Sequence, residues 1–422
     1  MSAVVETQRM AENRMRITID IELRGNLLQF EEDIQNALNQ AGAATMRAAI
    51  ERHDADGSPI KVGAMRFTSK GRFNQTYETL YGPVDVQRHV YQSQHGGRTF
   101  CPLEEDARML LNATPKYAKV VAAKYSYLAA PQLRCDLLES NARSISISYA
   151  KTIADFVGGA VAAKESHWEY AIPELPKEVA SVSVGLDGTC MLMKDGSWRQ
   201  AMCGSISLYD KSGERMYTVY AGAAPEYGKE AFHDRFAREL ERVKELFPDA
   251  LYVGLADGAP DNWSWLKPRT ERQLIDFWHA REYVGLAARA MFAKNEKDRE
   301  AWETEWSSRL KHERGVVPRL LREIGRAKKA AKAKDLEDLA TAERYFTNHK
   351  EMMGYWRHIS DGLPIGSGVT EAACKVLIKE RLCKSGMRWK EEGAACVIAL
   401  RALRMSDGRW EQFWGNVMRY GL

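Results

Sequence analysis

Two apolar runs of this chain end in the same way, with an aspartate followed by a glycine. The runs read VSVGLDG and ALYVGLADG, and their aspartates are Asp187 and Asp257. A carboxylate at the end of a buried strand costs free energy unless it has a partner, and the glycine beside it lets a ligand approach the backbone. An ordinary Asp-Gly turn explains either run alone, so the interpretation depends on how the strands are ordered.

The segments around these aspartates follow the order βββαβαβ. Three β-rich runs, VSVGLDGTCMLMK, WRQAMCGSISLYD and MYTVYAGA, are separated by KDGS and KSGE turns, and a charged helix, a fourth strand and a further strand and helix follow. This order, with acids at strand ends, is typical of a ribonuclease-H-like domain, although an ordinary α+β domain has the same pattern. In the former, the first and fourth strands are neighbours. Asp187 and Asp257 would then meet, and a divalent cation would relieve their repulsion.

A third carboxylate stands in the stretch PIGSGVTEAACKVLIKERLCKSGMRW, which spans residues 364–389. Glu371 lies near the start of a predicted helix, and helical spacing places Lys375 and Lys379 on its face. A salt-bridged surface helix is one interpretation, and a metal ligand beside a track for phosphates is the other. The two aspartates favour the second. Carboxylate oxygens favour Mg²⁺ or Mn²⁺, and two such ions about 3.5–4 Å apart can hold both oxygens of a phosphoryl displacement.

Clusters of cations indicate where a nucleic acid would bind. A basic run at 311–334 sets nine Lys and Arg against two Glu, and a solvated face explains it equally well. The zone after Glu371 is the stronger candidate, because a turn at Gly386 would expose its last residues. There Trp389 would either stack on an unpaired base or pack within the domain. The candidate DNA contacts of this zone are Lys375, Lys379, Arg381, Lys384, Arg388 and Trp389.

A third basic zone lies in LRCDLLESNARSISISYAKTIADFVGG. The pattern predicts a helix, a short polar break and a second helix that Ser144 or Ser146 would cap. Such a segment resembles a helix-turn-helix, in which Arg143, Tyr149 and Lys151 would face DNA. Two helices of an ordinary bundle would give the same pattern.

The bulk composition is that of a globular protein of several domains. The chain has 422 residues, 45% hydrophobic and 28% charged, and a net charge of only +4, which does not by itself indicate nucleic acid. No apolar run is long enough to span a membrane, and the N-terminus lacks an apolar signal core, so we expect a cytoplasmic protein. The domains expected are a mixed helix and β-hairpin domain at 1–105, a helix-turn-helix-like DNA-binding domain at 106–168, a catalytic core at 176–280, an all-helical insertion at 281–360, and the C-terminal helices of the core at 361–422.

Several stretches together resemble the Kra-type insertion-sequence transposases of bacteria, a DDE group. The matching pieces are GLDGT, LADGA, DFWHA and, above all, the block at 364–389, and GPVDVQRHVY and FCPLE extend the resemblance to most of the chain. The resemblance implies an α+β, multidomain protein whose ribonuclease-H-like catalytic domain, with a mixed five-stranded sheet, is interrupted by a helical insertion. It implies that Asp187, Asp257 and Glu371 are the catalytic residues and hold Mg²⁺.

DFWHA adds an auxiliary pair, Asp276 and His279, similar to a motif that follows the second aspartate in related transposases. His279 would contact a flanking DNA phosphate or orient a catalytic carboxylate, or it would be an ordinary core or surface histidine. Trp278 is expected in the core.

The chain departs from the family at one place. After the GPVDVQRHVY strand, relatives often carry a CxxC pair resembling half of a zinc ribbon, whereas Ser93 and Gly96 stand here. His95 and Cys101 alone do not make a zinc site, and the seven cysteines form no CxxC pair. We therefore expect no zinc and reduced cysteines.

The resemblance predicts a DNA transposase. Two Mg²⁺ or Mn²⁺ ions would support hydrolysis of a phosphodiester at the element ends, and the freed 3′-OH would then attack target DNA without a covalent protein intermediate. The expected partners are the double-stranded DNA of element ends and target and a second copy of the chain, as a homodimer or higher oligomer on DNA; no membrane is expected, and the DNA-bound protein would be associated with the nucleoid. The alternatives are a DNA-binding regulator that no longer cleaves and a ribonuclease-H-like structure-specific nuclease.

Overall fold

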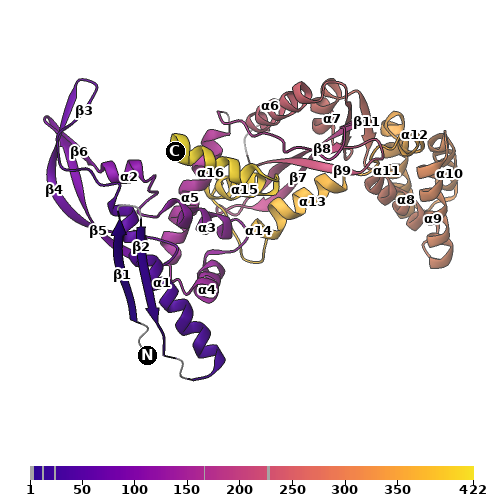
Figure 1. The fold of residues 1–422 in the computed structure, drawn as a ribbon. Helices are drawn as coiled ribbons and strands as arrows, with labels where there is room; N and C mark the ends of the chain where they lie inside the picture. Colours follow the sequence, from indigo (N-terminus) through magenta and orange to yellow (C-terminus); the bar gives the residue numbers. More distant parts are fainter. Residues whose placement is uncertain (1–3, 12–13, 23–24, 166, 226–228) are drawn as a thin grey trace. The chain divides into compact units, whose positions relative to one another are not determined.

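The computed structural model describes residues 4–11, 14–22, 25–165, 167–225 and 229–422. The chain divides into two compact units, one formed by Met1–Lys164 with Trp410–Leu422 and the other by Glu165–Arg409 (Figure 1). Each unit mixes helices with β-sheet, so the α+β, multidomain class expected from the sequence is confirmed. The finer domain boundaries stay predictions.

The first unit begins with a hairpin that the sequence analysis did not predict, in which β1 pairs antiparallel with β2. A long helix, α1, is followed by an antiparallel sheet in the order β3-β4-β5-β6, which confirms the predicted hairpins. Tyr77, Val86 and Leu103 are buried in its small core with the end of α1. The elements are β1 (Val4–Ala11), β2 (Arg14–Asp20), α1 (Leu27–Glu51), β3 (Ile60–Val62), β4 (Met65–Glu78), β5 (Pro83–Ser93), β6 (Gly96–Phe100), α2 (Pro102–Asp106), α3 (Pro115–Tyr125), α4 (Ala130–Asn141), α5 (Ile147–Lys164) and α16 (Arg409–Tyr420).

The predicted pair of helices with a polar break is present as α4 and α5. Ala142 ends α4 in the left-handed conformation (φ 50°). The Ser146 hydroxyl accepts a hydrogen bond of 3.1 Å from the backbone N–H of Tyr149, so Ser146 is the cap of the second helix.

The second unit is built on a five-stranded mixed sheet in the order β11-β10-β7-β8-β9. β7, β8 and β9 form an antiparallel meander, and β10 and β11 run parallel to β7. The first and fourth strands are neighbours, as predicted. Gly196 (φ 86°) and Gly213 (φ 81°) occupy the KDGS and KSGE turns, where the left-handed backbone favours glycine. The strands are β7 (Ser181–Leu192), β8 (Trp198–Tyr209), β9 (Arg215–Ala223), β10 (Leu251–Ala256) and β11 (Arg272–Ile275).

Helices cover both faces of this sheet (Figure 1). On one face, the Phe236 ring of α6 lies directly over Gly204 of β8, where a β-carbon would come within 2.7 Å of the ring. On the other face, Thr370 lies over Gly185 of β7 and Ile398 over Gly222 of β9. The segment after β11 is helical until 360, as predicted. The helices of the unit are α6 (Glu230–Leu246), α7 (Pro260–Leu266), α8 (Phe277–Met291), α9 (Glu296–His312), α10 (Val316–Ala330), α11 (Ala333–His349), α12 (Tyr355–Ser360), α13 (Gly368–Ala373), a π-helical turn (Cys374–Lys379), α14 (Glu380–Leu382) and α15 (Glu391–Met405), with 3₁₀ turns η2 (Lys267–Arg269) and η3 (Lys350–Met352).

Candidate functional site

Three parallel neighbours in the sheet, β7, β10 and β11, end their mutual pairing at the same level. The residue after the last paired position is an aspartate on each strand: Asp187, Asp257 and Asp276. We call these three residues the acid edge. Adjacent strands lie about 4.8 Å apart, so the backbone brings neighbouring carboxylates close together before any side chain adjusts.

Asp257 is held in a defined orientation by the helix that follows it. Its Oδ1 accepts hydrogen bonds from the backbone N–H of Ala259 (3.0 Å) and from the side-chain amide of Asn262 (3.2 Å). The indole N–H of Trp263 donates to the Asp257 carbonyl at 2.6 Å. Oδ2 accepts no hydrogen bond from the residues that the structure describes. Asp257 therefore has one oxygen fixed and the other available to a ligand.

Asp187 lies against a thiol from the segment that carries Glu371. Its Oδ1 accepts a hydrogen bond of 2.7 Å from the N–H of Gly188. The buried thiol of Cys374 lies near Cys203, the partner of Asp187 on β8, and near Asp187 itself. Interaction with Cys203, burial and the negative charge of Asp187 raise the pKa of Cys374 well above its ordinary value, so this thiol stays protonated.

Glu371 is positioned by the residue before it. Thr370 is buried, and its hydroxyl lies 2.6 Å from the Ser205 hydroxyl of β8. The Thr370 side chain packs on Gly185 of β7, where a β-carbon would clash with it. Glu371 itself is exposed, one helical turn before Cys374. Within the described ranges, however, no three acids, histidines or cysteines lie close enough together to hold a metal ion. The structure thus brings Asp187 and Asp257 to neighbouring positions and places the Glu371 helix on β7 and β8, but Glu371 does not join them in one cluster.

Asp276, the third member of the acid edge, accepts hydrogen bonds on both of its carboxylate oxygens. It is fully buried; Oδ1 accepts from the N–H groups of Trp278 (2.6 Å) and His279 (3.0 Å) and so caps α8. Oδ2 accepts from the N–H of Ser367, in the loop that leads to Glu371. Asp276 is therefore a positioning residue that ties the start of α8 to this loop.

The two residues beside Asp276 point elsewhere. The His279 ring is partly exposed, with Nδ1 3.5 Å from the Glu282 carboxylate. The expectation that Trp278 is in the core is wrong, because 52% of its surface is exposed. Its ring lies against Gly366, whose missing side chain lets the indole reach the loop, and the Arg281 guanidinium is 5.8 Å from the ring centre.

The structure adds a residue that the sequence analysis did not consider. His349, at the end of α11 in the helical insertion, approaches the turn after Asp257 so closely that a β-carbon on Gly258 would lie 3.0 Å from its Nε2. Its ring packs on Tyr345, and its Nδ1 is buried without a hydrogen-bond partner among the described residues. Burial lowers the pKa of His349, and the Asp257 charge opposes that shift. No spacing in the sequence signals this approach, because it depends on how the insertion folds back.

The predicted DNA contacts fall into two groups. Arg381 is buried with its guanidinium 5.2 Å from the Trp389 ring centre, and the Trp389 N–H donates to the Leu382 carbonyl at 2.9 Å, so this tryptophan packs within the domain. A π-helical turn replaces the regular helix expected after Glu371, so simple i, i+4 spacing does not extend through it. Four cations are exposed and form no ion pair with any residue that the structure describes: Lys375, Lys379, Lys384 and Arg388.

In the first unit, Arg143 is an internal residue. It is buried, pairs with the Glu78 carboxylate at 2.5 Å and donates to the Thr79 carbonyl. This placement argues against a phosphate contact. Lys151 is exposed and lies 2.7 Å from Asp155 on the same helix.

Comparison with known proteins identifies no family for this chain. No model of a protein family matches the chain, and no curated protein matches it. Over the described part of the chain, no helix combines the length and the apolar character needed to cross a membrane.

Proposed function

We propose that this chain is a DDE-type DNA transposase that cleaves phosphodiesters at the ends of a bacterial insertion sequence and transfers the freed 3′-OH to target DNA. The observation that carries the proposal is the neighbouring placement of Asp187 and Asp257, each just past the last paired residue of the parallel strands β7 and β10. Asp187 lies within β7, which continues to Leu192 beside β8, and not at the strand end that the sequence predicted. The strand order supports the proposal, because three antiparallel strands followed by two parallel to the first is the arrangement expected of a ribonuclease-H-like domain.

The donors at the acid edge suit a hard divalent cation. Asp187 and Asp257 would hold it through carboxylate oxygens, the ligands that Mg²⁺ and Mn²⁺ prefer, and Glu371 would complete the set. When bound, such ions stabilise the charge that develops on phosphoryl oxygens and lower the pKa of water. The Ala259 amide and Asn262 orient Asp257 for this role.

Glu371 would complete the site by turning toward Asp187, because Cys374 of the same segment lies near Asp187. The exposed lysines after Glu371 bind the DNA backbone beside the acids, and the buried Asp276 fixes the loop from which the helix starts.

Single substitutions test the assignment. Purified protein is incubated with Mg²⁺ and DNA carrying the inverted repeats that flank the coding region. We expect Asp187→Asn, Asp257→Asn and Glu371→Gln each to reduce cleavage at least about 1000-fold, a loss of about 4 kcal/mol of transition-state stabilisation, with DNA affinity nearly unchanged. Asp195→Asn is the matched control, because Asp195 is an exposed aspartate in the β7–β8 turn.

The outcomes separate the candidate functions. Cleavage at the normal rate by any of the three variants would remove that residue from the catalytic set. Cleavage without strand-transfer products would instead indicate a structure-specific nuclease. Specific binding of the ends without cleavage in Mg²⁺ or Mn²⁺ would indicate a regulator derived from a transposase.

A further inference from the structure

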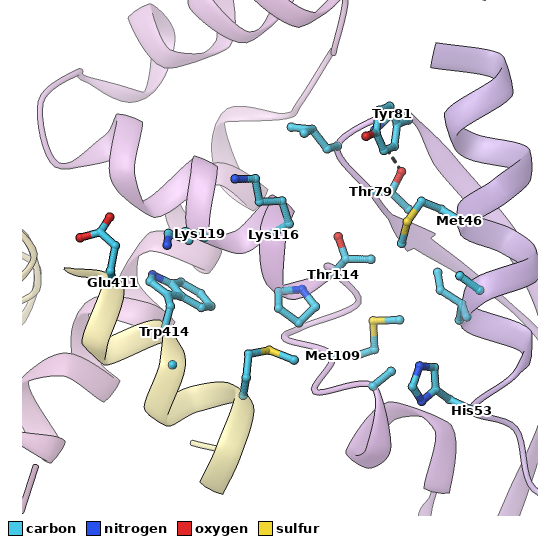
Figure 2. Close-up of a pocket in the computed structure, with 17 residues that line it drawn as sticks. Met46, His53, Thr79, Tyr81, Met109, Thr114, Lys116, Lys119, Glu411 and Trp414 are labelled. Atoms are coloured by element: carbon cyan, nitrogen blue, oxygen red, sulfur yellow. Dashed lines mark hydrogen bonds between the residues drawn. The ribbon is translucent and has the colours of Figure 1, made fainter. Parts of the chain in front are cut away.

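The first unit contains an apolar pocket of 660 Å³ (Figure 2). Its walls come from the last two turns of α1, from the residues around α2 and the start of α3, and from α16. Three methionines, Met46, Met109 and Met418, lie in these walls. Methionine side chains adapt their shape and are common in grooves that receive apolar side chains of a partner. The volume is that of a site for a ligand or anchor rather than a packing defect.

The pocket also has polar requirements. Lys116 is exposed at its wall, with Lys119 and Glu411 nearby (Figure 2). Trp414 is buried in the wall, and its indole N–H has no hydrogen-bond partner among the residues described. This N–H is closed off from the cavity, so the charged character of the pocket comes from the two lysines and Glu411. The lysines outnumber the glutamate, so the pocket suits an occupant that combines apolar side chains with carboxylates.

A segment with this chemistry stands at the other end of α1. Leu27 and Leu28 are 78% and 68% exposed, the most exposed large apolar side chains in the described ranges. Glu31 and Glu32 follow on the next turn and are exposed as well. Two adjacent leucines in water, followed by two carboxylates, form an anchor. Leu28, Glu31 and Glu32 also line an open hollow with Leu138 and Glu139 of α4, but Leu28 stays exposed there.

One chain cannot bring its own anchor to its own pocket. α1 is 25 residues long, about 37 Å, and the anchor and the pocket lie at its opposite ends. Two copies with antiparallel α1 helices satisfy both ends at once, as a two-fold symmetric interface requires. Ile34 and Leu38, which are also exposed, share a face with Leu27 and would meet at the centre of such a pair.

We propose that the chain forms a symmetric dimer. Leu27 and Leu28 of one copy enter the pocket lined by Met46, Met109 and Met418 of the other copy, and Glu31 and Glu32 face its Lys116. The dimer forms without DNA. The inference does not rest on the acid edge, so it stands or falls independently of the proposed catalytic function.

The oligomeric state of the full chain tests this interface. Sedimentation and light scattering without DNA are expected to show a dimer in the micromolar range. Leu28→Asp should weaken the dimer about 30-fold or more, because it places a charge in an apolar anchor. Leu246→Asp, a similarly exposed leucine (57%) at the end of α6, should leave it unchanged. A monomer throughout this range, or equal dimerisation by wild type and Leu28→Asp, would overturn the proposal.

Charge reversal identifies the partner residues. Lys116→Glu alone, or Glu31→Lys with Glu32→Lys, should weaken the dimer about fivefold, and the three changes together should restore it. All three residues are exposed, so folding should be unaffected. Loss without recovery in the combined variant would contradict the pairing.

Photo-crosslinking identifies the residues that lie next to Leu28 in the dimer. A benzophenone amino acid at position 28 should attach to peptides containing Met46 or Met418, and mixing isotope-labelled with unlabelled protein should show that the bond joins two copies. Attachment within one copy, or to a surface outside the pocket, would refute the arrangement.

Discussion

Two basic stretches of the second unit have similar compositions but use their cations differently. The segment after Glu371 carries four exposed cations with no ion-pair partner among the described residues. In the run at 311–334 of the insertion, three of the nine cations pair with carboxylates: Arg319 with Glu313, Arg326 with Glu323 and Lys328 with Glu343, at 2.5, 2.9 and 2.5 Å. Four others are exposed and form no ion pair among the described residues: Arg322, Lys329, Lys332 and Lys334. Two further cations of that run lie against rings, Lys311 on Phe277 and Arg314 on Trp356.

The difference shows why a count of lysines and arginines is a weak guide to a nucleic-acid surface. A cation that already has a carboxylate partner gains little from a phosphate, since the partner must first be displaced. Unpaired cations release condensed counterions from DNA at no such cost. The unpaired cations of both stretches are therefore the candidates for the DNA backbone, and those after Glu371 lie on the segment that packs against β7, the strand of Asp187. The three paired cations of the insertion stabilise its own helices.

The largest expected effect is on DNA affinity. Replacing Lys375, Lys379, Lys384 and Arg388 together by alanine should weaken binding at least about 100-fold and lower the salt dependence, log Kd against log salt, by about 3 to 4. The matched variant replaces Arg319, Arg326 and Lys328 and should change affinity less than about threefold. Fluorescence anisotropy at several salt concentrations measures both. An equal loss of DNA affinity in the two variants would show that paired and unpaired cations contribute alike.

A second expected effect is on the pH dependence of folding stability, and it tests the burial of His358 near the end of the insertion. Burial lowers the pKa of His358 on α12 to about 4 from 6.5, with the Arg272 charge contributing. Below pH 6.5 the unfolded chain gains a proton that the folded chain does not, so stability is full above pH 6.5 and falls between pH 6.5 and 4. The loss at pH 5 should be about 2 kcal/mol. Urea unfolding of wild type and His358→Leu measures it, and an unchanged pH slope in the variant would contradict the assignment.

The smallest effect is on folding stability at neutral pH. Lys328→Ala should lower the free energy of unfolding by less than about 1 kcal/mol, because its ion pair with Glu343 is partly exposed. Lys379→Ala, which removes no ion pair in the described structure, should change it by nothing measurable. Thermal unfolding of both variants sharpens the contrast, and a larger loss in Lys379→Ala would show that this lysine has a structural role.

Local patterns in the sequence predicted the parts of the fold that depend on local chemistry. Alternating apolar residues and glycine turns identified the strands, and the βββαβαβ order placed β7 beside β10, which brought Asp187 and Asp257 together. Ser146 was identified as a possible cap for the same reason, since capping involves residues three apart.

The features that the sequence analysis missed depend on contacts between distant residues. Arg143 meets Glu78, 65 positions earlier, and nothing near Arg143 in the sequence signals this carboxylate. Trp278 is exposed, and its ring lies against Gly366, which is 88 positions later in the sequence. His349 reaches Gly258 only after the whole insertion has folded. The sequence placed Glu371 at the start of a helix, but its distance from the aspartates depends on the loop and the π-helical turn around it.

The carboxylate of Asp276 joins two pieces of chain that are 91 positions apart, the start of α8 and the loop before α13. Because one fully buried carboxylate accepts hydrogen bonds from both, the start of α8 and the loop before Glu371 cannot separate without leaving buried polar groups unpaired. Any displacement of one would therefore carry the other with it.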